Sequence, residues 1–387
     1  MKKMHAAFAL LALLLLSCNG PKEITVNPDK ATTPIPIPAP KPPKNIILLI
    51  GDGMGTSQIY GGMIANHNVL ALERFKHIGF IKTYSFDNII TDSGAGATAF
   101  SIGQKAYNNA IGVSADTMAH ETVLESAAKA GKATGIIATS TITHATPASF
   151  VAHVPHREMH NEIAWEIVNS PLQLFIGGGR QHFNKREDGR DLIAEAQQRG
   201  FFMVDNEKAM NELPANVRFG ALLWEDAAPK KTDGRDDILP RATSFALDRL
   251  SQNEKGFFLM VEGSQIDWGG HANDADYIVQ EMIDFDKAVA LALDFAEKDG
   301  ETLVIVTADH ETGGFALAGG DFAKGTVKGA FTSTKHTAVM VPVFAFGPGA
   351  QYFTGIQENT DLYTHMMQLL ELKVSRQPVS WRAIKRN

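Results

Sequence analysis

Acidic and histidine side chains gather directly after short apolar runs of this sequence, and they are the residue types that bind metal ions. Carboxylate oxygens and imidazole nitrogens are protein ligands of Zn²⁺, and an Asp and a His four residues apart on a turn or short helix can reach one ion. Two such clusters indicate a two-metal site, which can stabilise the attacking and leaving oxygens of a phosphoryl transfer. The candidate ligands are Asp52, Glu262, Asp267, His271, Asp309, His310 and His336.

Each cluster also has a plainer interpretation. The glycines around Asp52 could bind a dinucleotide, but Thr56 stands where the third glycine of G-x-G-x-x-G belongs. A turn-forming aspartate then remains as the alternative to a metal ligand. The adjacent Asp309 and His310 could form a simple ion pair. An exposed acidic loop around Asp267 would account poorly for the apolar run before it and for the tryptophan within it.

Ser93 is the candidate nucleophile. It precedes a run of small helix-compatible residues, Gly94–Ala99, and the free amide groups at a helix start favour an anion. A serine in this position is more often only a helix cap. Because no G-x-S-x-G motif is present, activation by a histidine is unsupported. A metal ion that lowers the pKa of the serine is the alternative that keeps it as a nucleophile.

The chain from Lys44 onward alternates apolar runs with helical patterns, which predicts an α/β fold. Continuous aliphatic runs are typical of buried strands in a parallel sheet. The expected strands are Ile46–Ile50, Thr134–Ala138, Leu174–Ile176, Phe257–Val261, Leu303–Thr307 and Val343–Phe346. The expected helices are Glu121–Ala130, Asn161–Asn169, Leu192–Arg199 and Tyr277–Lys298.

The candidate ligands follow these strands, and ligands bind beyond the carboxyl ends of the strands in open α/β sheets. We therefore predict a three-layer sandwich, in which helices flank a mostly parallel central sheet and the site lies at one edge of it. Residues 180–240 are polar and carry few strand signals. They are predicted to be a surface excursion.

The composition limits the kind of partner. The 387 residues are 44% hydrophobic and carry a formal net charge of −7, which suits one large domain or two ordinary ones. No long run of Lys or Arg supports nucleic acid as a partner. An anionic substrate would therefore have to be held by local cations or by metal ions.

The N-terminal residues predict export. The stretch Ala6–Leu16 has the length of a signal peptide and is too short to span a bilayer. It runs into Leu-Leu-Ser-Cys, which resembles the lipobox of bacterial lipoproteins, so residues 1–18 are expected to be a lipoprotein-type signal peptide with acylation at Cys18. A chance cysteine at an ordinary cleavage site is the alternative. Cys18 is the only cysteine, which excludes an intramolecular disulfide.

Residues 19–43 are expected to be a tether, because their proline-rich end favours an extended chain. The catalytic domain would then comprise residues 44–387. A lipid anchor followed by a spacer implies a domain held at a bacterial membrane, in the periplasm or at the cell surface.

Six segments resemble the alkaline phosphatase family and occur in family order. They are NIILLIGDGMG (45–55), TDSGAGATAFSIGQKAYNNAIGV (91–113), HATPASFVAHVPHR (144–157), VEGSQIDWGGHAND (261–274), VTADHETGG (306–314) and KHTAVMVPVFAFGPGA (335–350). The resemblance implies hydrolysis of phosphate monoesters through a phosphoserine intermediate, with two Zn²⁺ and one Mg²⁺ per chain. Family members are commonly homodimers, which leaves a homodimer possible here.

The resemblance also implies how the metal ligands are shared. The first zinc ion, which holds the leaving-group oxygen and later the attacking water, would be bound by Asp267, His271 and His336. The second zinc ion, which activates the serine, would be bound by Asp52, Asp309 and His310. The magnesium ion would be bound by Asp52, Thr146 and Glu262.

Four further residues take their roles through the same resemblance. Ser93 would form the phosphoserine, and Arg157 would hold two phosphate oxygens with its fork of N–H donors. His144 and Trp268 stand where the best-known enterobacterial members carry an aspartate and a lysine. They are expected to lie behind the ligands and to influence the affinity of the third metal ion and the release of phosphate.

Two other functions remain as alternatives. One is a phosphodiesterase, sulfatase or related esterase of the same superfamily, although the C/S-x-P-x-R setting of sulfatases is missing around Ser93 and diesterases tend to lack an equivalent of Arg157. The other is a non-catalytic lipoprotein that binds phosphate or metal ions. The presence of Ser93 together with every inferred ligand argues against a non-catalytic protein.

Overall fold

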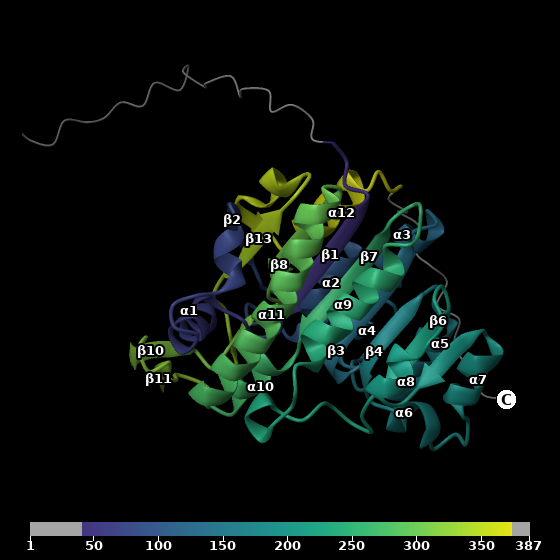
Figure 1. The fold of residues 1–387 in the computed structure, drawn as a ribbon, viewed down its shortest axis with the longest axis horizontal. Helices are drawn as coiled ribbons and strands as arrows, with labels where there is room; N and C mark the ends of the chain where they lie inside the picture. Colours follow the sequence, from purple (N-terminus) through teal and green to yellow (C-terminus); the bar gives the residue numbers. More distant parts are fainter. Residues whose placement is uncertain (1–40, 374–387) are drawn as a thin grey trace, which may run out of the picture. The chain divides into compact units, whose positions relative to one another are not determined.

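A ten-stranded sheet forms the centre of the fold (Figure 1). The computed structural model describes residues 41–373, so Cys18, the expected signal peptide and the tether up to residue 40 lie outside the described residues. Only β13 runs antiparallel to its neighbours, which confirms the mostly parallel sheet. The order is β14 (Gly355–Glu358), β2 (His77–Lys82), β13 (Val341–Phe346), β8 (Thr302–Thr307), β1 (Asn45–Gly51), β7 (Phe257–Gly263), β3 (Ala133–Thr141), β4 (Leu174–Gly178), β6 (Arg218–Leu222) and β5 (Phe201–Val204).

Helices cover both faces of the sheet, which confirms the three layers (Figure 1). One face packs against α9 (Ile238–Leu250) and α11 (Ala275–Asp299), and α1 (Thr56–Ala65) packs on α11. The other face carries α2 (Ser93–Ile102), α3 (Val123–Lys129), α4 (Ala145–Ala148) and α12 (Asp361–Leu369). Strands buried on both faces need apolar side chains, and the run Ile46–Ile50 supplies them in β1, every position of which is buried.

The remaining elements are short. They are η1 (Ala71–Arg74), α5 (His160–Asn169), α6 (Gln181–Asn184), α7 (Leu192–Gln198), α8 (Glu207–Asn211), η2 (Lys231–Asp233), α10 (Gln265–His271) and η3 (Ala350–Phe353), together with the strand pairs β9 (Glu311–Thr312) with β12 (His336–Thr337) and β10 (Ala316–Asp321) with β11 (Thr326–Ala330). Within residues 41–373, no helix has both the length and the apolar character that crossing a bilayer requires.

The predicted strands and helices all form, with ends that shift by at most three residues. The prediction for residues 180–240 is wrong, because this segment supplies β5 and β6 at one end of the main sheet. Four of the five residues of β6 are buried, and the strand pairs with β4. These strands are only four and five residues long, and their partners lie far away in the sequence, so no local pattern distinguished them from loops.

The neighbouring strands β8, β1 and β7 determine where the polar residues meet. Ile50 of β1 lies beside Glu262 of β7 and also beside Thr307 of β8. Because all three strands are parallel, the residues that follow them emerge at the same edge of the sheet. Asp52 and Asp309 therefore lie close together, although 257 positions separate them in the sequence.

Candidate metal centre and nucleophile

Asp52, Asp309 and His310 form a buried group that could hold one metal ion. Their ligand atoms lie within 4.8 Å of one another, and all three residues have no exposed surface. The Nε2 atom of His310 is 3.5 Å from Asp52 Oδ1 and 3.3 Å from Asp309 Oδ2. The structure thus brings together the three residues expected to bind the second zinc ion.

A second group gathers around Asp267. Its ligand atoms lie within 4.8 Å of those of His310 and His336, and the Nε2 atom of His271 is 3.3 Å from Asp267 Oδ2 and 3.2 Å from His336 Nε2. Asp267 and His271 both belong to the short helix α10, as their spacing predicted. The three residues expected to bind the first zinc ion therefore lie together, and His310 stands between the two groups.

The histidines of this group are oriented by backbone carbonyls. The Nδ1 atom of His271 is 2.7 Å from the carbonyl oxygen of Thr334, and that of His336 is 2.9 Å from the carbonyl oxygen of Thr91. A carbonyl only accepts, so each Nδ1 donates a proton to it. Each Nε2 then faces Asp267, at 3.3 Å from Oδ2 for His271 and at 3.5 Å from Oδ1 for His336. A ring orientation fixed in this way is typical of histidines that bind a metal ion.

The third group contains Asp52, Glu262 and His144. One ring nitrogen of His144, which the sequence placed behind the ligands, lies within 4.8 Å of an oxygen of each carboxylate. Thr146, the expected third ligand, is buried in α4, and its hydroxyl lies near Glu262. Thr146 therefore lies where it could contribute to a third ion beside Asp52 and Glu262.

These buried carboxylates fit a set of cations. Within residues 41–373, Asp52 Oδ1, Asp309 Oδ2 and Glu262 Oε1 are among the buried side-chain atoms without a hydrogen-bond partner, and unpaired buried charges are costly. Burial and the neighbouring acidic groups raise the pKa of Asp52 well above its usual value and that of Asp309 to about 8. Burial raises the pKa of Glu262 to about 7. Bound metal ions would compensate this negative charge.

Ser93 begins helix α2, as its sequence predicted, and faces the metal ligands. Its hydroxyl oxygen is 3.2 Å from His310 Nε2 and 3.4 Å from Asp52 Oδ2. The side chain is 2% exposed. Ser93 is not the cap, because Asp92 occupies the N-cap position and accepts a hydrogen bond from the amide of Ala95. The plainer interpretation of Ser93 as a helix cap is therefore wrong.

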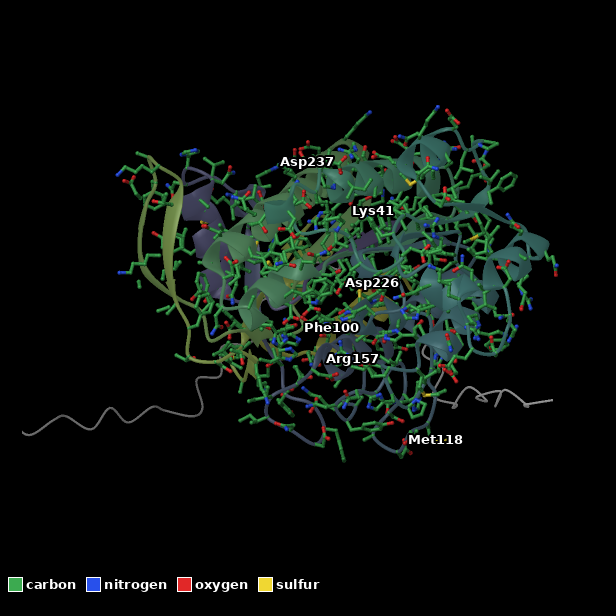
Figure 2. All side chains as sticks on the ribbon, turned by 90° about the horizontal axis from the view of Figure 1, so that it is seen from below. Lys41, Phe100, Met118, Arg157, Asp226 and Asp237 are labelled. Carbon is green, nitrogen blue, oxygen red and sulfur yellow. The ribbon has the colours of Figure 1, made fainter. Side chains whose placement is uncertain are left out.

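Arg157 reaches the start of α2 from a separate segment, and Figure 2 labels it. Its Nη1 donates to Asp92 Oδ2 at 2.9 Å, and its Nη2 lies 3.2 Å from His144 Nε2. Burial lowers the pKa of His144 to about 3, with a further contribution from Arg157, so this imidazole is neutral and accepts the bond. Two of the five guanidinium donors are engaged in these contacts, and three remain for an anion.

Asp92 and Thr312 belong to the site, but neither was among the predicted residues. The N-cap preference for aspartate could have drawn attention to Asp92, whereas its ion pair with Arg157 spans 65 positions. The hydroxyl of Thr312 donates to Asp267 Oδ1 and lies 3.2 Å from Nδ1 of His310. Thr312 thereby connects ligands of two groups. No sequence signal distinguishes it from an ordinary strand threonine.

Trp268 lies at the edge of the third group. Its ring meets that of His144 edge to face, with the centroids 6.1 Å apart. This contact places Trp268 beside His144, and the expectation that both lie behind the ligands stays a prediction.

The chemistry of this centre follows from the groups that surround Ser93. The serine faces buried metal ligands at a helix start, and a guanidinium with free donors stands at the same end of the helix. Nucleophilic hydroxyls activated by metal ions and arginines that recognise phosphate are typical of phosphoryl transfer. The centre thus defines a metal-dependent hydrolase of phosphate esters.

Comparisons with known proteins give the family. The sequence profile described as alkaline phosphatase matches residues 43–329. Alkaline phosphatase 3 of Bacillus subtilis is 44% identical, over 71% of this chain and 62% of that protein. Alkaline phosphatase 4 of the same organism is 35% identical, over 85% of this chain and 89% of that protein. The structure of the alkaline phosphatase from the Antarctic bacterium TAB5 matches with a TM-score of 0.82 and 43% identity, over 86% of this chain and 99% of that chain.

The chain belongs to the alkaline phosphatase family. The predicted family and fold are confirmed, as is the enzyme class, a metal-dependent phosphomonoester hydrolase.

Proposed function

We propose that this chain hydrolyses phosphate monoesters in two steps through a phosphoserine at Ser93. The position of Ser93 carries the proposal, because its hydroxyl oxygen lies 3.2 Å and 3.4 Å from atoms of two candidate metal ligands. In the first step, the serine oxygen attacks phosphorus and the alcohol leaves. In the second step, water attacks the phosphoserine, which releases inorganic phosphate and restores the hydroxyl.

The residues of the chain would bind two Zn²⁺ and one Mg²⁺ in the three groups described above. The expected zinc ligands are Asp267, His271 and His336 for one ion, and Asp52, Asp309 and His310 for the other. The expected magnesium ligands are Asp52, Thr146 and Glu262. A structure of a TAB5 alkaline phosphatase mutant with Mg bound in its M3 site supports magnesium as the third metal. Bound ions would supply charge neutralisation and would lower the pKa of hydroxyl groups.

Arg157 and the start of α2 would hold the phosphate. The Arg157 guanidinium keeps three donors for oxygens, and its contacts with Asp92 and His144 restrict its rotation. The N-terminal end of a helix adds a positive partial charge next to Ser93. Together they would orient the phosphorus atom toward the serine oxygen, and positioning of this kind accounts for much of phosphoryl-transfer catalysis.

The test compares a monoester with a diester. We expect the metal-loaded full chain to hydrolyse p-nitrophenyl phosphate at mildly alkaline pH, and bis(p-nitrophenyl) phosphate at least about 100-fold more slowly, because a diester offers fewer charged oxygens to Arg157 and to the ions. Release of p-nitrophenol measures both reactions. A faster diester reaction would show that the chain is a phosphodiesterase, and the absence of both reactions would leave a binding protein.

We also propose that the chain is a lipoprotein anchored to a bacterial membrane through Cys18, with its catalytic domain in the periplasm or at the cell surface. The support is the sequence alone: the apolar stretch Ala6–Leu16 and the lipobox-like residues that end at Cys18. We expect Cys18→Ser to move phosphatase activity from the membrane fraction to the soluble fraction of cells that express the full chain. An unchanged distribution would exclude the lipid anchor.

A homodimer is the proposed assembly. The segment just before Ser93 exposes three large apolar side chains, Phe86, Ile89 and Ile90, which are 66%, 72% and 38% exposed. Apolar side chains at one place on a surface suit a contact with a second protein. A molar mass twice that of the chain, measured by light scattering, would support the dimer, and the mass of one chain would exclude it.

A further inference from the structure

His153 is a buried histidine whose two ring nitrogens both face oxygen atoms. Its Nδ1 is 3.4 Å from Glu166 Oε2, and its Nε2 is 2.8 Å from the carbonyl oxygen of His120 and 3.4 Å from Glu125 Oε2. Ionised carboxylates and carbonyls only accept hydrogen bonds, so both nitrogens must carry a proton. The geometry therefore requires a positively charged imidazolium, although only 6% of the residue is exposed.

The charges around His153 agree with this assignment. Burial alone would lower the pKa of His153, but hydrogen bonds to Glu125 and Glu166 and the charges of both raise it to about 10. His153 in turn lowers the pKa of Glu125, against the effect of burial. His153 and Glu125 thus keep each other charged in a site with little access to water.

The two carboxylates belong to different helices. Glu125 lies in the first turn of α3, where it also accepts a hydrogen bond from the backbone amide of Thr122 at 2.9 Å. Glu166 lies in α5 and accepts a second hydrogen bond, from the backbone amide of His153 at 2.9 Å. The imidazolium therefore connects α3, α5 and the backbone at residue 153.

This backbone leads directly to Arg157. Val154 exchanges two backbone hydrogen bonds with Ile111, at 3.0 and 3.1 Å. The hydroxyl of Tyr107 donates to the carbonyl oxygen of Pro155 at 3.0 Å, and the amide of Arg157 donates to the carbonyl oxygen of Asn109 at 2.8 Å. Residues 153–157 are therefore held along their length, and His153 is the charged contact at their start.

We propose that His153 is a positioning residue, which as an imidazolium between Glu125 and Glu166 fixes residues 153–157 and thereby holds the Arg157 guanidinium in the phosphate site. The inference rests on the proposed role of Arg157 in phosphate binding. A neutral side chain at position 153 would leave one buried carboxylate without a charged partner. An unpaired buried charge raises the free energy of the folded state. The two helices and the segment between them would then shift, and a displacement of about 1 Å at a binding group can cost up to about 100-fold.

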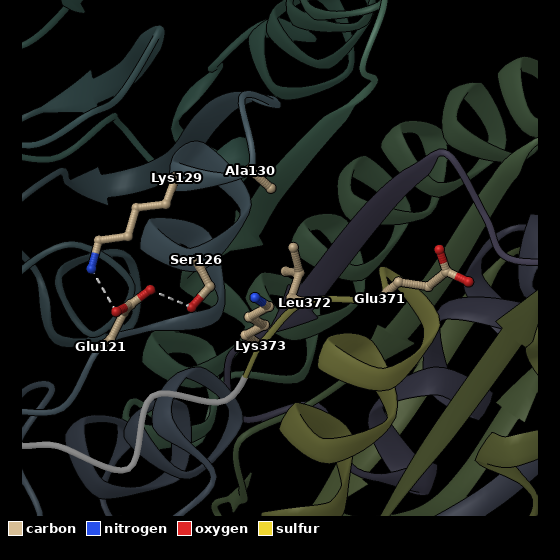
Figure 3. A pocket seen from close by; sticks show the side chains of 7 residues that line it. All are labelled: Glu121, Ser126, Lys129, Ala130, Glu371, Leu372 and Lys373. Carbon is tan, nitrogen blue, oxygen red and sulfur yellow. Dashed lines mark hydrogen bonds and ion pairs between the residues drawn. The ribbon is translucent and has the colours of Figure 1, made fainter.

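The main test measures how strongly inorganic phosphate inhibits hydrolysis of p-nitrophenyl phosphate. His153→Gln has a similar size but no charge, and it is expected to raise the inhibition constant of phosphate about tenfold. The matched control is Glu121→Gln, just before α3. Glu121 pairs with Lys129 and accepts from Ser126 beside a separate pocket (Figure 3). The Glu121 side chain makes none of the contacts around His153, so the inhibition constant of phosphate for Glu121→Gln is expected to stay unchanged.

A double-mutant cycle with Arg157→Ala separates positioning from a general loss of structure. Arg157→Ala alone is expected to raise the inhibition constant, by about 10- to 100-fold for a lost charged hydrogen bond. Adding His153→Gln to Arg157→Ala is expected to have no further effect, because His153 acts through Arg157. A further tenfold rise of the inhibition constant in the double mutant would overturn the proposal, because it would show that His153 affects phosphate binding without acting through Arg157.

The pH dependence gives a second readout. The pKa of His153 is about 10 in the folded protein and about 6.5 when unfolded. The imidazolium therefore stabilises the protein fully below about pH 6.5, and this contribution disappears as the pH rises through about 10. The facing groups are Glu125 of α3, Glu166 of α5, and the carbonyl and imidazole of His120. Burial lowers the pKa of the His120 imidazole, and the charge of His153 contributes to this. Lys129 of α3 acts on Glu125. The wild type is expected to lose phosphate affinity near pH 10, and His153→Gln is expected to lack this step.

Each outcome decides the question. If His153→Gln binds phosphate as tightly as the wild type while Arg157→Ala binds it weakly, His153 does not position Arg157 and the inference is wrong. If Arg157→Ala also binds phosphate normally, both the inference about His153 and the proposed role of Arg157 are wrong. Should His153→Gln not fold, Glu166→Gln replaces it, because the amide oxygen at that position still accepts from the His153 backbone while the charge is removed. Wild-type phosphate affinity in Glu166→Gln would then overturn the inference.

Discussion

Replacing Ser93 by alanine is expected to lower kcat for p-nitrophenyl phosphate by a factor of about 10³ or more, as the loss of a serine nucleophile does in other hydrolases. The serine oxygen is the group that forms the bond to phosphorus, and no other hydroxyl contacts both Asp52 and His310 in the part of the chain that the structure describes. The alanine variant should still fold, because Asp92 rather than Ser93 caps α2. Steady-state kinetics with the metal-loaded protein measure the effect.

Ser101→Ala is the matched control for Ser93→Ala. Ser101 lies in the same helix and is equally buried, but its hydroxyl donates only to the carbonyl of Thr98, at 3.2 Å. It should retain kcat within about twofold, because a replacement away from the reacting atoms has a small effect. Acid-quenched wild-type protein should also carry phosphate on Ser93, detectable by mass spectrometry. A Ser93→Ala variant with wild-type turnover would exclude the phosphoserine mechanism.

Removal of metal ions is expected to abolish turnover and to destabilise the protein. Asp52, Asp309 and Glu262 are fully buried and have unpartnered oxygens, so a chelated protein must either bury negative charge or bind protons. Metal ions present at about 1,000 times their dissociation constant should add about 4 kcal/mol to the free energy of unfolding. Thermal unfolding with a chelator, and after Zn²⁺ and Mg²⁺ are restored, measures this difference.

The sign of the pH dependence follows from the raised pKa values. In the metal-free protein the pKa is about 8 for Asp309 and about 7 for Glu262. A carboxyl group whose folded pKa exceeds its unfolded value stabilises the protein below the unfolded pKa, and this contribution is lost as pH rises through the folded pKa. Metal ions must displace these protons, so their affinity rises with pH up to about 8. The gain in Tm from metal ions should therefore be larger at pH 8.5 than at pH 6.

Asp286→Asn is a control for this experiment. Asp286 is also buried with a raised pKa, of about 6, but it accepts hydrogen bonds from the amides of Ala71 and Leu72 in a different part of the fold. The gain in Tm from metal ions should survive Asp286→Asn and should fall sharply in Asp309→Asn. Equal gains in both variants would contradict the assignment of Asp309 as a ligand.

Much of the fold could be predicted from the sequence, because strands buried on two faces and amphipathic helices are local patterns. The run Ile46–Ile50 predicts a buried strand, and it forms β1 in the middle of the sheet. The spacing of Asp267 and His271 predicts a single helical face, which α10 provides. The small residues after Ser93 predict a helix start. Each of these signals lies within about ten residues, where backbone preference and side-chain periodicity act directly.

Only the tertiary structure determined which of these local features meet. The register of β8, β1 and β7 brings Asp52 next to Asp309, and the ion pair of Asp92 with Arg157 joins segments 65 positions apart. The charge on His153 depends on two carboxylates from different helices, and a ring nitrogen of His144 lies within 4.8 Å of oxygens of Asp52 and Glu262 only after the sheet has formed. Residue types therefore indicated the chemistry early, whereas distances between groups far apart in the chain, on which pKa values and ion pairing depend, arise only from the packed fold.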